Sequence, residues 1–389
     1  MLKLSKVAKP LQQSGIRAAS TKCHEISGIN LGQGICDIAI VDPIKLAAKH
    51  AIEQDKSTYS ACEGAYKLRE ALAAKIKSFN KIDISAEHEL MVSHGATGAF
   101  VCAVQTLFNP GDEVILFEPF YGYHKNILNL MQINVSAVPI SLSDFSIDMD
   151  YLESVITKKT RGIVVCTPNN PTGKVFSRAE LQAIGDFANK HDLTIITDEI
   201  YEYITYPGFE HVSIASLSDE LKQRTLTISG FSKTFNMTGW RLGYVSGPKH
   251  IIAKMSLMQD LYYVCPVTPL QYAGIAALSM PENYYQNMQQ AFLKKRQLTV
   301  NALQCMGLKF SVPEGAYYIL ADCKALSIGN GQQTVDYLLD KAKVATVAGA
   351  SFYNAPETGT NSIRFCYALD ESVLSKAFKQ MQTVLKEVK

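Results

Sequence analysis

The chain has 389 residues, of which 47% are hydrophobic and 19% charged, and its formal net charge is +2. This length allows two or three domains, and the composition is typical of a globular protein with a large core. The small charge gives no electrostatic reason to expect nucleic acid or an anionic membrane as a partner, and no apolar run is long enough to cross a bilayer.

Nine cysteines are scattered along the chain without a Cys-x-x-Cys pair or a Cys/His cluster of metal-ligand spacing. Several lie within apolar runs, as Cys102 and Cys166 do, which is typical of reduced, buried thiols. We therefore expect a cytoplasmic protein without a metal site. The first 24 residues carry five basic residues and no acid, as transit peptides do, but no secretory apolar core.

Short apolar runs alternate with helical patterns through most of the chain. In chain order the sequence predicts a helix over 65–78, a short strand from Leu90 leading into helix 97–107, strands 113–117, 134–138 and 162–165, helix 179–190, strands 193–196, 226–228 and 243–245, and helix 284–306. Such alternation predicts a mostly parallel sheet covered by helices on both faces. Ligands of such sheets bind beyond the carboxyl ends of the strands, so residues at these ends are candidates for one shared site.

Lys233 stands alone among small and apolar residues, shortly after the predicted strand 226–228. Burial at a strand end lowers the pKa of a lysine because it disfavours the charged form. Such an amine is the nucleophile needed for a Schiff base with an aldehyde. Most lysines instead lie in exposed loops, which is the alternative here. Arg241 follows eight residues later, and a guanidinium can bind a phosphate through two parallel hydrogen bonds.

Gly95, Ala96 and Thr97 follow the strand that begins at Leu90. At a helix start their free N–H groups and the positive end of the helix dipole would favour an anion, although an ordinary turn has the same pattern. Asp198 ends another apolar strand, where a buried carboxylate needs a cationic partner. Asn170 lies in an Asn-Pro-Thr-Gly turn after strand 162–165, a pattern that plain turns also show.

Arg364 lies in the apolar run Ile-Arg-Phe-Cys-Tyr, where a guanidinium is costly to bury unless it is paired. A substrate carboxylate would pair with it in the bidentate manner. Tyr121 follows strand 113–117 in a loop rich in aromatic residues, for which core packing is the alternative.

These segments resemble, in this order from about Asn30 to Leu369, the pyridoxal-phosphate-dependent class I and II aminotransferases of fold type I. The kynurenine, glutamine, methionine and aromatic branch looks closest. The resemblance implies an α/β fold with a large domain on a mainly parallel seven-stranded sheet and a small α+β domain. It implies an N-terminal arm with part of the small domain over 1–45, the large cofactor-binding domain over 46–285, and the C-terminal small domain over 286–389.

The resemblance also implies the roles of the site residues. Lys233 would bind pyridoxal 5'-phosphate and move protons, Asp198 would hold the proton of the ring nitrogen, and Tyr201 would be the third catalytic residue. The implied cofactor-binding residues are Gly95, Ala96, Thr97, Tyr121, Asn170, Asp198, Tyr201, Lys233, Arg241 and Tyr59, and the implied substrate-binding residues are Arg364, Gly34 and Asn170. Tyr59 would reach across a dimer interface to the neighbour's phosphate, which implies a homodimer with shared sites.

Two positions depart from the family pattern. The family often has a phosphate-binding serine three residues before the lysine, where this chain has Gly230, so Ser229, Ser232 or the backbone alone could take that contact. The segment Ile35-Cys36-Asp37 replaces the usual Phe-Pro-Asp at the pocket entrance.

The expected function is transfer of the α-amino group of an L-amino acid to a 2-oxo acid such as 2-oxoglutarate, with ping-pong kinetics. Neutral, aromatic or sulfur-containing substrates would fit the apolar candidates Tyr121, Tyr263, Tyr317 and Phe352, and no arginine is clearly placed for a second carboxylate. A C–S β-lyase or an aspartate-preferring aminotransferase on the same fold is the alternative. A non-catalytic regulator would need an added DNA-binding module, and a Rossmann dehydrogenase would need a Gly-x-Gly-x-x-Gly after a strand.

Overall fold

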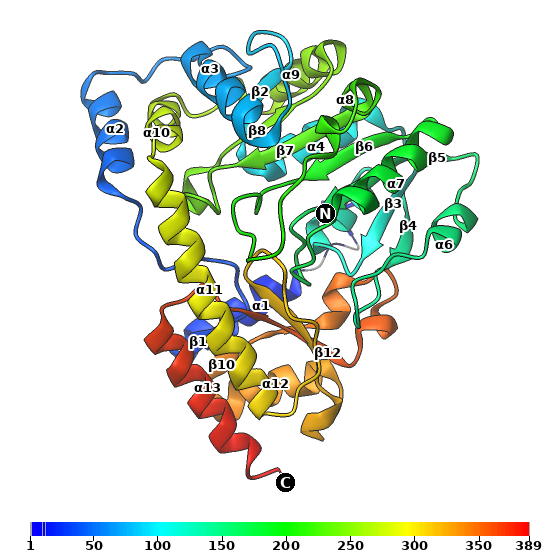
Figure 1. Cartoon of the computed structure of the whole chain (residues 1–389), viewed down its shortest axis with the longest axis vertical. Coiled ribbons are helices and arrows are strands. Elements are labelled where there is room, and N and C mark those ends of the chain that lie inside the picture. Colours follow the sequence, from blue (N-terminus) through cyan, green and yellow to red (C-terminus); the bar gives the residue numbers. More distant parts are fainter. Residues whose placement is uncertain (1, 10, 12, 389) are drawn as a thin grey trace.

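A seven-stranded sheet forms the centre of the computed structural model, which describes residues 2–9, 11 and 13–388 (Figure 1). Its strands, in spatial order, are β2 (Leu90–His94), β8 (Leu242–Ser246), β7 (Thr225–Gly230), β6 (Thr194–Asp198), β5 (Thr160–Cys166), β3 (Glu113–Glu118) and β4 (Asn134–Pro139). In this sheet β8 runs in the direction opposite to the other six strands. The α/β fold with a mainly parallel seven-stranded sheet is thus confirmed, and each predicted strand lies within three residues of an observed one.

Both faces of the sheet are buried, as the continuous Val/Ile runs predict. Val164 and Ile196 pack into one core with helices α4 (Gly95–Leu107) and α9 (Lys249–Tyr263). Their sequence neighbours Ile163 and Ile195 pack on the opposite face with α7 (Arg178–Lys190). Each such side chain contributes about 1.5–3 kcal/mol by leaving water.

Local signals explain where several helices begin. Helix α7 starts at a capping box, in which the Ser177 and Glu180 side chains each accept from the other's backbone N–H. The predicted helix 65–78 is α3 (Tyr66–Lys75) continued by a π-helical turn (Ile76–Asn80). The predicted helix 97–107 begins earlier, at Gly95, and the predicted helix 284–306 is α11 (Glu282–Cys305).

A second, smaller group of strands lies below the large sheet in Figure 1. Its strands are β1 (Ile29–Asn30) paired parallel with β10 (Val344–Ala345), and β11 (Val347–Ala348), β12 (Ser362–Cys366) and β9 (Tyr318–Asp322) in antiparallel order. Helices α1 (Gly15–Glu25), α12 (Gly331–Ala342) and α13 (Glu371–Leu385) cover this group, and α11 runs between the two sheets. The domain boundaries at 45/46 and 285/286 stay predictions.

The remaining helices surround the large sheet. They are α2 (Asp42–Glu53), which packs on α10 (Thr268–Leu278), and α5 (Gly122–Leu130), α6 (Met149–Ser154) and α8 (Asp219–Arg224). Short 3-10 turns lie at Ile214–Ser216, Thr238–Trp240, Lys324–Leu326, Gly349–Phe352 and Pro356–Gly359. Within the described ranges, no helix combines the length and apolar character that a membrane crossing requires.

Candidate active site

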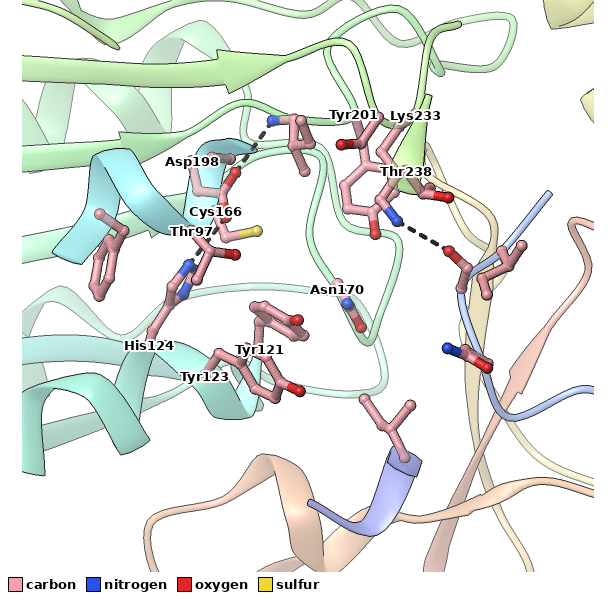
Figure 2. A pocket seen from close by; sticks show the side chains of 18 of the residues that line it. Thr97, Tyr121, Tyr123, His124, Cys166, Asn170, Asp198, Tyr201, Lys233 and Thr238 are labelled. Atoms are coloured by element: carbon pink, nitrogen blue, oxygen red, sulfur yellow. Dashed lines mark hydrogen bonds and ion pairs between the residues drawn. The ribbon is translucent and has the colours of Figure 1, made fainter. Parts of the chain in front are cut away.

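A cavity of about 540 Å³ lies beyond the carboxyl ends of β5, β6 and β7, between the large sheet and the smaller group of strands (Figure 2). Parallel sheets hold their ligands at this edge. The wall contains ten of the residues predicted for the site: Gly34, Ala96, Thr97, Tyr121, Asn170, Asp198, Tyr201, Lys233, Arg241 and Arg364. Gly95 and Tyr59 are not part of this wall.

Lys233 reaches into the cavity from the loop after β7. Its Nζ donates to the Gly34 carbonyl over 2.9 Å and lies 5.8 Å from the centre of the Tyr201 ring (Figure 2). Burial lowers the pKa of Lys233 to about 8, and the nearby Arg364 and Arg241 cations act in the same direction. A much larger fraction of this amine is therefore neutral, and nucleophilic, near neutral pH than of an exposed lysine.

Asp198 has a partner that the sequence did not reveal. The Nε2 atom of His124, in α5, lies 2.9 Å from Asp198 Oδ2, and both side chains are buried. The backbone N–H of Ile200 donates to the other carboxylate oxygen over 3.2 Å. His124 follows the aromatic loop of Tyr121 in sequence, and nothing in the surrounding sequence distinguishes it from an ordinary buried histidine. It holds the carboxylate toward the cavity.

Arg364 is a fully buried cation in the cavity wall. Its Nη1 donates to Asn170 Oδ1 over 2.7 Å and its Nη2 to the Gly32 carbonyl, while the Tyr318 ring centre lies 4.4 Å from Cζ. These partners are neutral, and within the described part of the chain its Nε has no hydrogen-bond acceptor. An incoming carboxylate would supply the missing charge, as the sequence predicts.

Ala96 and Thr97 line the cavity at the start of α4, where free N–H groups favour an anion. Gly95 lies behind them with φ +68°, and a Cβ there would come within 2.5 Å of Arg241 Nη2. Gly95 thus makes room for the guanidinium instead of lining the cavity. Arg241 Nη1 donates to the Thr238 carbonyl over 2.8 Å.

Gly230 occupies the position where the family often has a phosphate-binding serine, and the structure shows which nearby hydroxyl reaches the cavity. A Cβ at Gly230 would lie 2.9 Å from the Gly243 Cα of β8, so the two strands leave no space for a side chain. Ser229 donates to Glu202, away from the cavity. Ser232 does line the cavity, as Arg241 does, so Ser232 or the backbone stays a candidate for the phosphate contact.

Aromatic side chains form much of the wall, but not all of those expected. Tyr121 lines the cavity and stacks on Tyr123 with ring centres 5.0 Å apart. Tyr318 lines it as well and shares a 2.9 Å hydrogen bond with the Tyr201 hydroxyl. The wall does not include the other three apolar candidates, Tyr263, Tyr317 and Phe352. A side chain at Gly34 would overlap the Tyr318 hydroxyl, which explains why this position is glycine.

Helix α1 brings an arginine to the cavity that the sequence pattern did not place there. Ser14, Ile16 and Arg17 all belong to the wall, because α1 packs against the strands β10 and β11 of the smaller group. The sequence indicates no arginine clearly placed for a second carboxylate, and Arg17 is a candidate for that contact because it lines the cavity. The segment Ser14-Gly-Ile-Arg17 resembles the N-terminal arm of the family, but this resemblance implies no contact of Arg17 with the cavity, and no strand end lies nearby.

Tyr59 lies outside the cavity, and 80% of its surface is exposed. Its predicted contact would come from a neighbouring copy, so the role of Tyr59 stays a prediction.

The sequence model of the family described as "Aminotransferase class I and II" matches residues 26–380. The chain is 35% identical to "Aromatic-amino-acid aminotransferase 2" of Thermococcus litoralis, over 99% of both chains. It is 36% identical to an "Aspartate aminotransferase" of Pyrococcus abyssi, over 93% of this chain and 92% of that one.

The fold of this chain is also similar to that of a solved aminotransferase structure. The aromatic aminotransferase of Pyrococcus horikoshii superposes with a TM-score of 0.88 at 35% identity, over 95% of this chain and 99% of that one. Both the sequence match and the fold extend over nearly the whole chain. The chain therefore belongs to the class I and II aminotransferases and is an aminotransferase of the pyridoxal-phosphate-dependent fold type I family.

Proposed function

We propose that the cavity binds pyridoxal 5'-phosphate and that the enzyme moves the α-amino group of an L-amino acid to a 2-oxo acid such as 2-oxoglutarate in a ping-pong reaction. The observation that carries this proposal is the meeting of Lys233, Asp198 and Arg364 in one wall. The lowered pKa of the Lys233 amine, the Asp198 carboxylate fixed by His124, and the buried Arg364 guanidinium, which has no carboxylate partner among the described residues, would serve three different parts of one reaction.

The residues present fit this cofactor. Its phosphate would lie at Ala96, Thr97, Ser232 and Arg241, its ring nitrogen at Asp198, its 3-oxygen at Asn170 and Tyr201, its ring face at Tyr121, and its aldehyde at Lys233. Pyridoxal phosphate supplies the aldehyde and an electron-withdrawing ring that stabilises negative charge at the substrate α-carbon. The unshared acceptor capacity of Asp198, held by His124, suits a protonated ring nitrogen.

The chain's own residues then bind substrate and move the proton. Arg364 would bind the α-carboxylate of every substrate and so orient the α-carbon toward Lys233. The Lys233 amine would take the α-proton as general base and return it as general acid, a role that suits its pKa of about 8. Gly34, close against Tyr318, would let the first segment of the chain cover the substrate.

Two observations bear on the substrate. The aromatic wall of Tyr121, Tyr123 and Tyr318 favours neutral and aromatic side chains. Arg17, in the same wall, favours a second carboxylate, as in 2-oxoglutarate, glutamate or aspartate. We propose a broad enzyme with neutral or aromatic donors and a dicarboxylate acceptor. A relative named for aromatic amino acids and a relative named for aspartate are about equally similar to this chain, so aspartate preference is an equally supported alternative.

The test is a donor panel in single turnover. Each amino acid is added to the cofactor-loaded protein without an oxo acid, and loss of the visible absorption band ranks the donors. Bleaching by aromatic and neutral amino acids supports the proposal, and bleaching by aspartate and glutamate alone supports the aspartate alternative. Release of pyruvate and ammonia from cysteine conjugates without an oxo acid would indicate a β-lyase.

A matched pair of variants tests the acceptor site. Arg17→Gln is expected to raise the KM for 2-oxoglutarate at least about 10-fold, because an ionic hydrogen bond is lost, and to leave the KM for an aromatic donor within about twofold. Arg161→Gln, a change of an arginine that does not line the cavity, is the control. Equal KM values for both variants would contradict the role of Arg17.

We also propose a cytoplasmic homodimer with shared sites. The exposed Tyr59, together with exposed Leu261 and Tyr262, provides apolar surface for a second copy. The nine cysteines are free thiols, which fits a reducing compartment.

A further inference from the structure

A second cluster of charged and polar side chains lies buried behind the carboxyl ends of β6 and β7 and beside the middle of β8, and none of its members lines the cavity. It consists of Lys75, Asn80, Glu199, Glu202, His211, Ser213, Ser229 and Tyr244. Buried charges are costly unless they are paired and hydrogen-bonded. The contacts within the cluster therefore show which segments of the chain these charges connect.

Glu202 is the centre of the cluster. Its Oε2 accepts from Lys75 Nζ over 2.6 Å and from Asn80 Nδ2 over 2.8 Å. Its Oε1 accepts from the Ser229 hydroxyl over 2.7 Å and from the Tyr244 hydroxyl over 3.1 Å. Burial opposes the charge of Glu202, yet Lys75 and the hydrogen bonds hold the pKa of this carboxyl below its usual value.

Lys75 supplies the positive charge that makes this burial possible. Its Nζ also donates to Asn80 Oδ1 over 2.9 Å and to the Tyr244 hydroxyl over 3.0 Å, and it lies 4.9 Å from the centre of the Phe79 ring. Ligand atoms of Glu199, Glu202 and His211 lie within 4.8 Å of one another, as in a metal site. The Lys75 ammonium already pairs with Glu202, and His211 pairs with Glu199 over 2.9 Å, so the geometry indicates a clamp between segments of the chain and not a metal centre.

The clamp joins two of the segments that carry cavity residues. The loop after β6 holds Glu199 and Glu202, each directly after one of the cavity residues Asp198 and Tyr201. Strand β7 holds Ser229, four residues before Lys233, and the Ser229 hydroxyl contacts both the Glu202 carboxylate and the Glu199 carbonyl, the latter over 3.3 Å.

We propose that Glu202, its charge held by Lys75, is a positioning residue that acts through Ser229 to fix Lys233 relative to Asp198. The inference rests on the proposed role of Lys233. Without the Ser229 contact, the end of β7 loses its side-chain hydrogen bonds to the loop that directly follows Asp198. A displacement of about 1 Å at reacting groups can lower a rate about 100-fold, so a tie at this place matters for turnover.

Ser229 and Ser213 form a matched pair for the test. Each is 1% exposed, and each donates to a carboxylate of the cluster, Ser213 to Glu199 Oε2 over 2.5 Å. Only Ser229 lies on the strand that leads to Lys233. Ser229→Ala is expected to lower kcat about 10-fold to 100-fold and to weaken cofactor affinity in an absorbance titration, with KM unchanged within about twofold. Ser213→Ala is expected to leave all three values within about twofold.

A conservative variant and the melting temperature of the cofactor-free protein complete the experiment. Both alanine variants are expected to lower Tm by similar amounts, since each removes one buried hydroxyl that has more than one hydrogen-bond partner. Ser229→Thr keeps a hydroxyl and is expected to recover most of kcat. Equal losses of kcat in Ser229→Ala and Ser213→Ala, or no recovery in Ser229→Thr, would overturn the positioning role. An active Lys233→Ala variant would instead remove the proposed function itself, and its inactivity would leave this test intact.

Discussion

The charge on Lys233 links the chemistry of this residue to the stability of the protein. Burial lowers its pKa to about 8 from 10.5, so between these values the folded protein binds fewer protons than the unfolded chain. The free energy of unfolding should therefore rise with pH across this window, and below it the buried amine costs up to about 3 kcal/mol. Lys233→Met should be more stable than the wild type at pH 7, and the difference should vanish by about pH 10.5. Urea unfolding of both cofactor-free proteins measures this, and a pH-independent difference would contradict it.

For Arg364, the geometry of the guanidinium contacts should matter as much as the positive charge. A lysine keeps the charge but cannot make the two parallel hydrogen bonds of a guanidinium or stack on Tyr318 in the same way. Arg364→Lys is expected to raise KM for every amino acid at least about 10-fold. The visible band of the cofactor-loaded variant should be unchanged. Steady-state kinetics on several donors measures this, and a KM change confined to one donor would contradict a contact with the α-carboxylate.

At the scale of elements, the close contact of β7 and β8 limits what Gly230 can become. A methyl group there would meet the Gly243 Cα at 2.9 Å, and backbone atoms cannot rotate out of the way. Gly230→Ala is expected to destabilise the protein by about 1–3 kcal/mol. Gly239→Ala, where nothing lies within 4 Å of the added carbon, is the control and should leave Tm unchanged. Thermal unfolding compares the two, and equal Tm values would show that the strands can separate at low cost.

Strands and helices with strong local signals could be predicted, and contacts between distant segments could not. The Val/Ile runs and the capping box of Ser177 lie entirely within short stretches, so β3 to β7 and α7 were predictable. Lys233, Asp198 and Arg364 carried a signal because each is a charged residue at or within an apolar strand. His124 and Arg17 are ordinary members of amphipathic helices, and only the packing of α5 and α1 brings them to the cavity.

At the scale of the whole molecule, the position of Tyr59 predicts that assembly and cofactor binding depend on one another. An exposed tyrosine that completes a neighbour's phosphate site would make the monomer bind the cofactor less tightly than the dimer. Cofactor affinity is expected to fall as the protein is diluted below its dimer dissociation constant. Tyr59→Phe should lower the affinity about 10-fold without changing the assembly. Sedimentation and absorbance titration over one dilution series measure both, and an affinity independent of dilution would contradict shared sites.

The 2.9 Å hydrogen bond from Lys233 to the Gly34 carbonyl has a consequence for the motion of the chain. The Lys233 nitrogen helps to anchor the segment around Gly34, together with the Tyr317 hydroxyl, which donates to the same carbonyl over 3.2 Å, and it is also the proposed reactive group of the site. When Lys233 reacts with an aldehyde, its hydrogen bond to the Gly34 carbonyl must weaken. The mobility of the backbone near Gly34 should therefore report whether the site is occupied. Hydrogen exchange of this segment should become faster when the site is occupied, and this measurement needs no chromophore. The same increase is expected with an aldehyde that binds Lys233 but cannot be turned over.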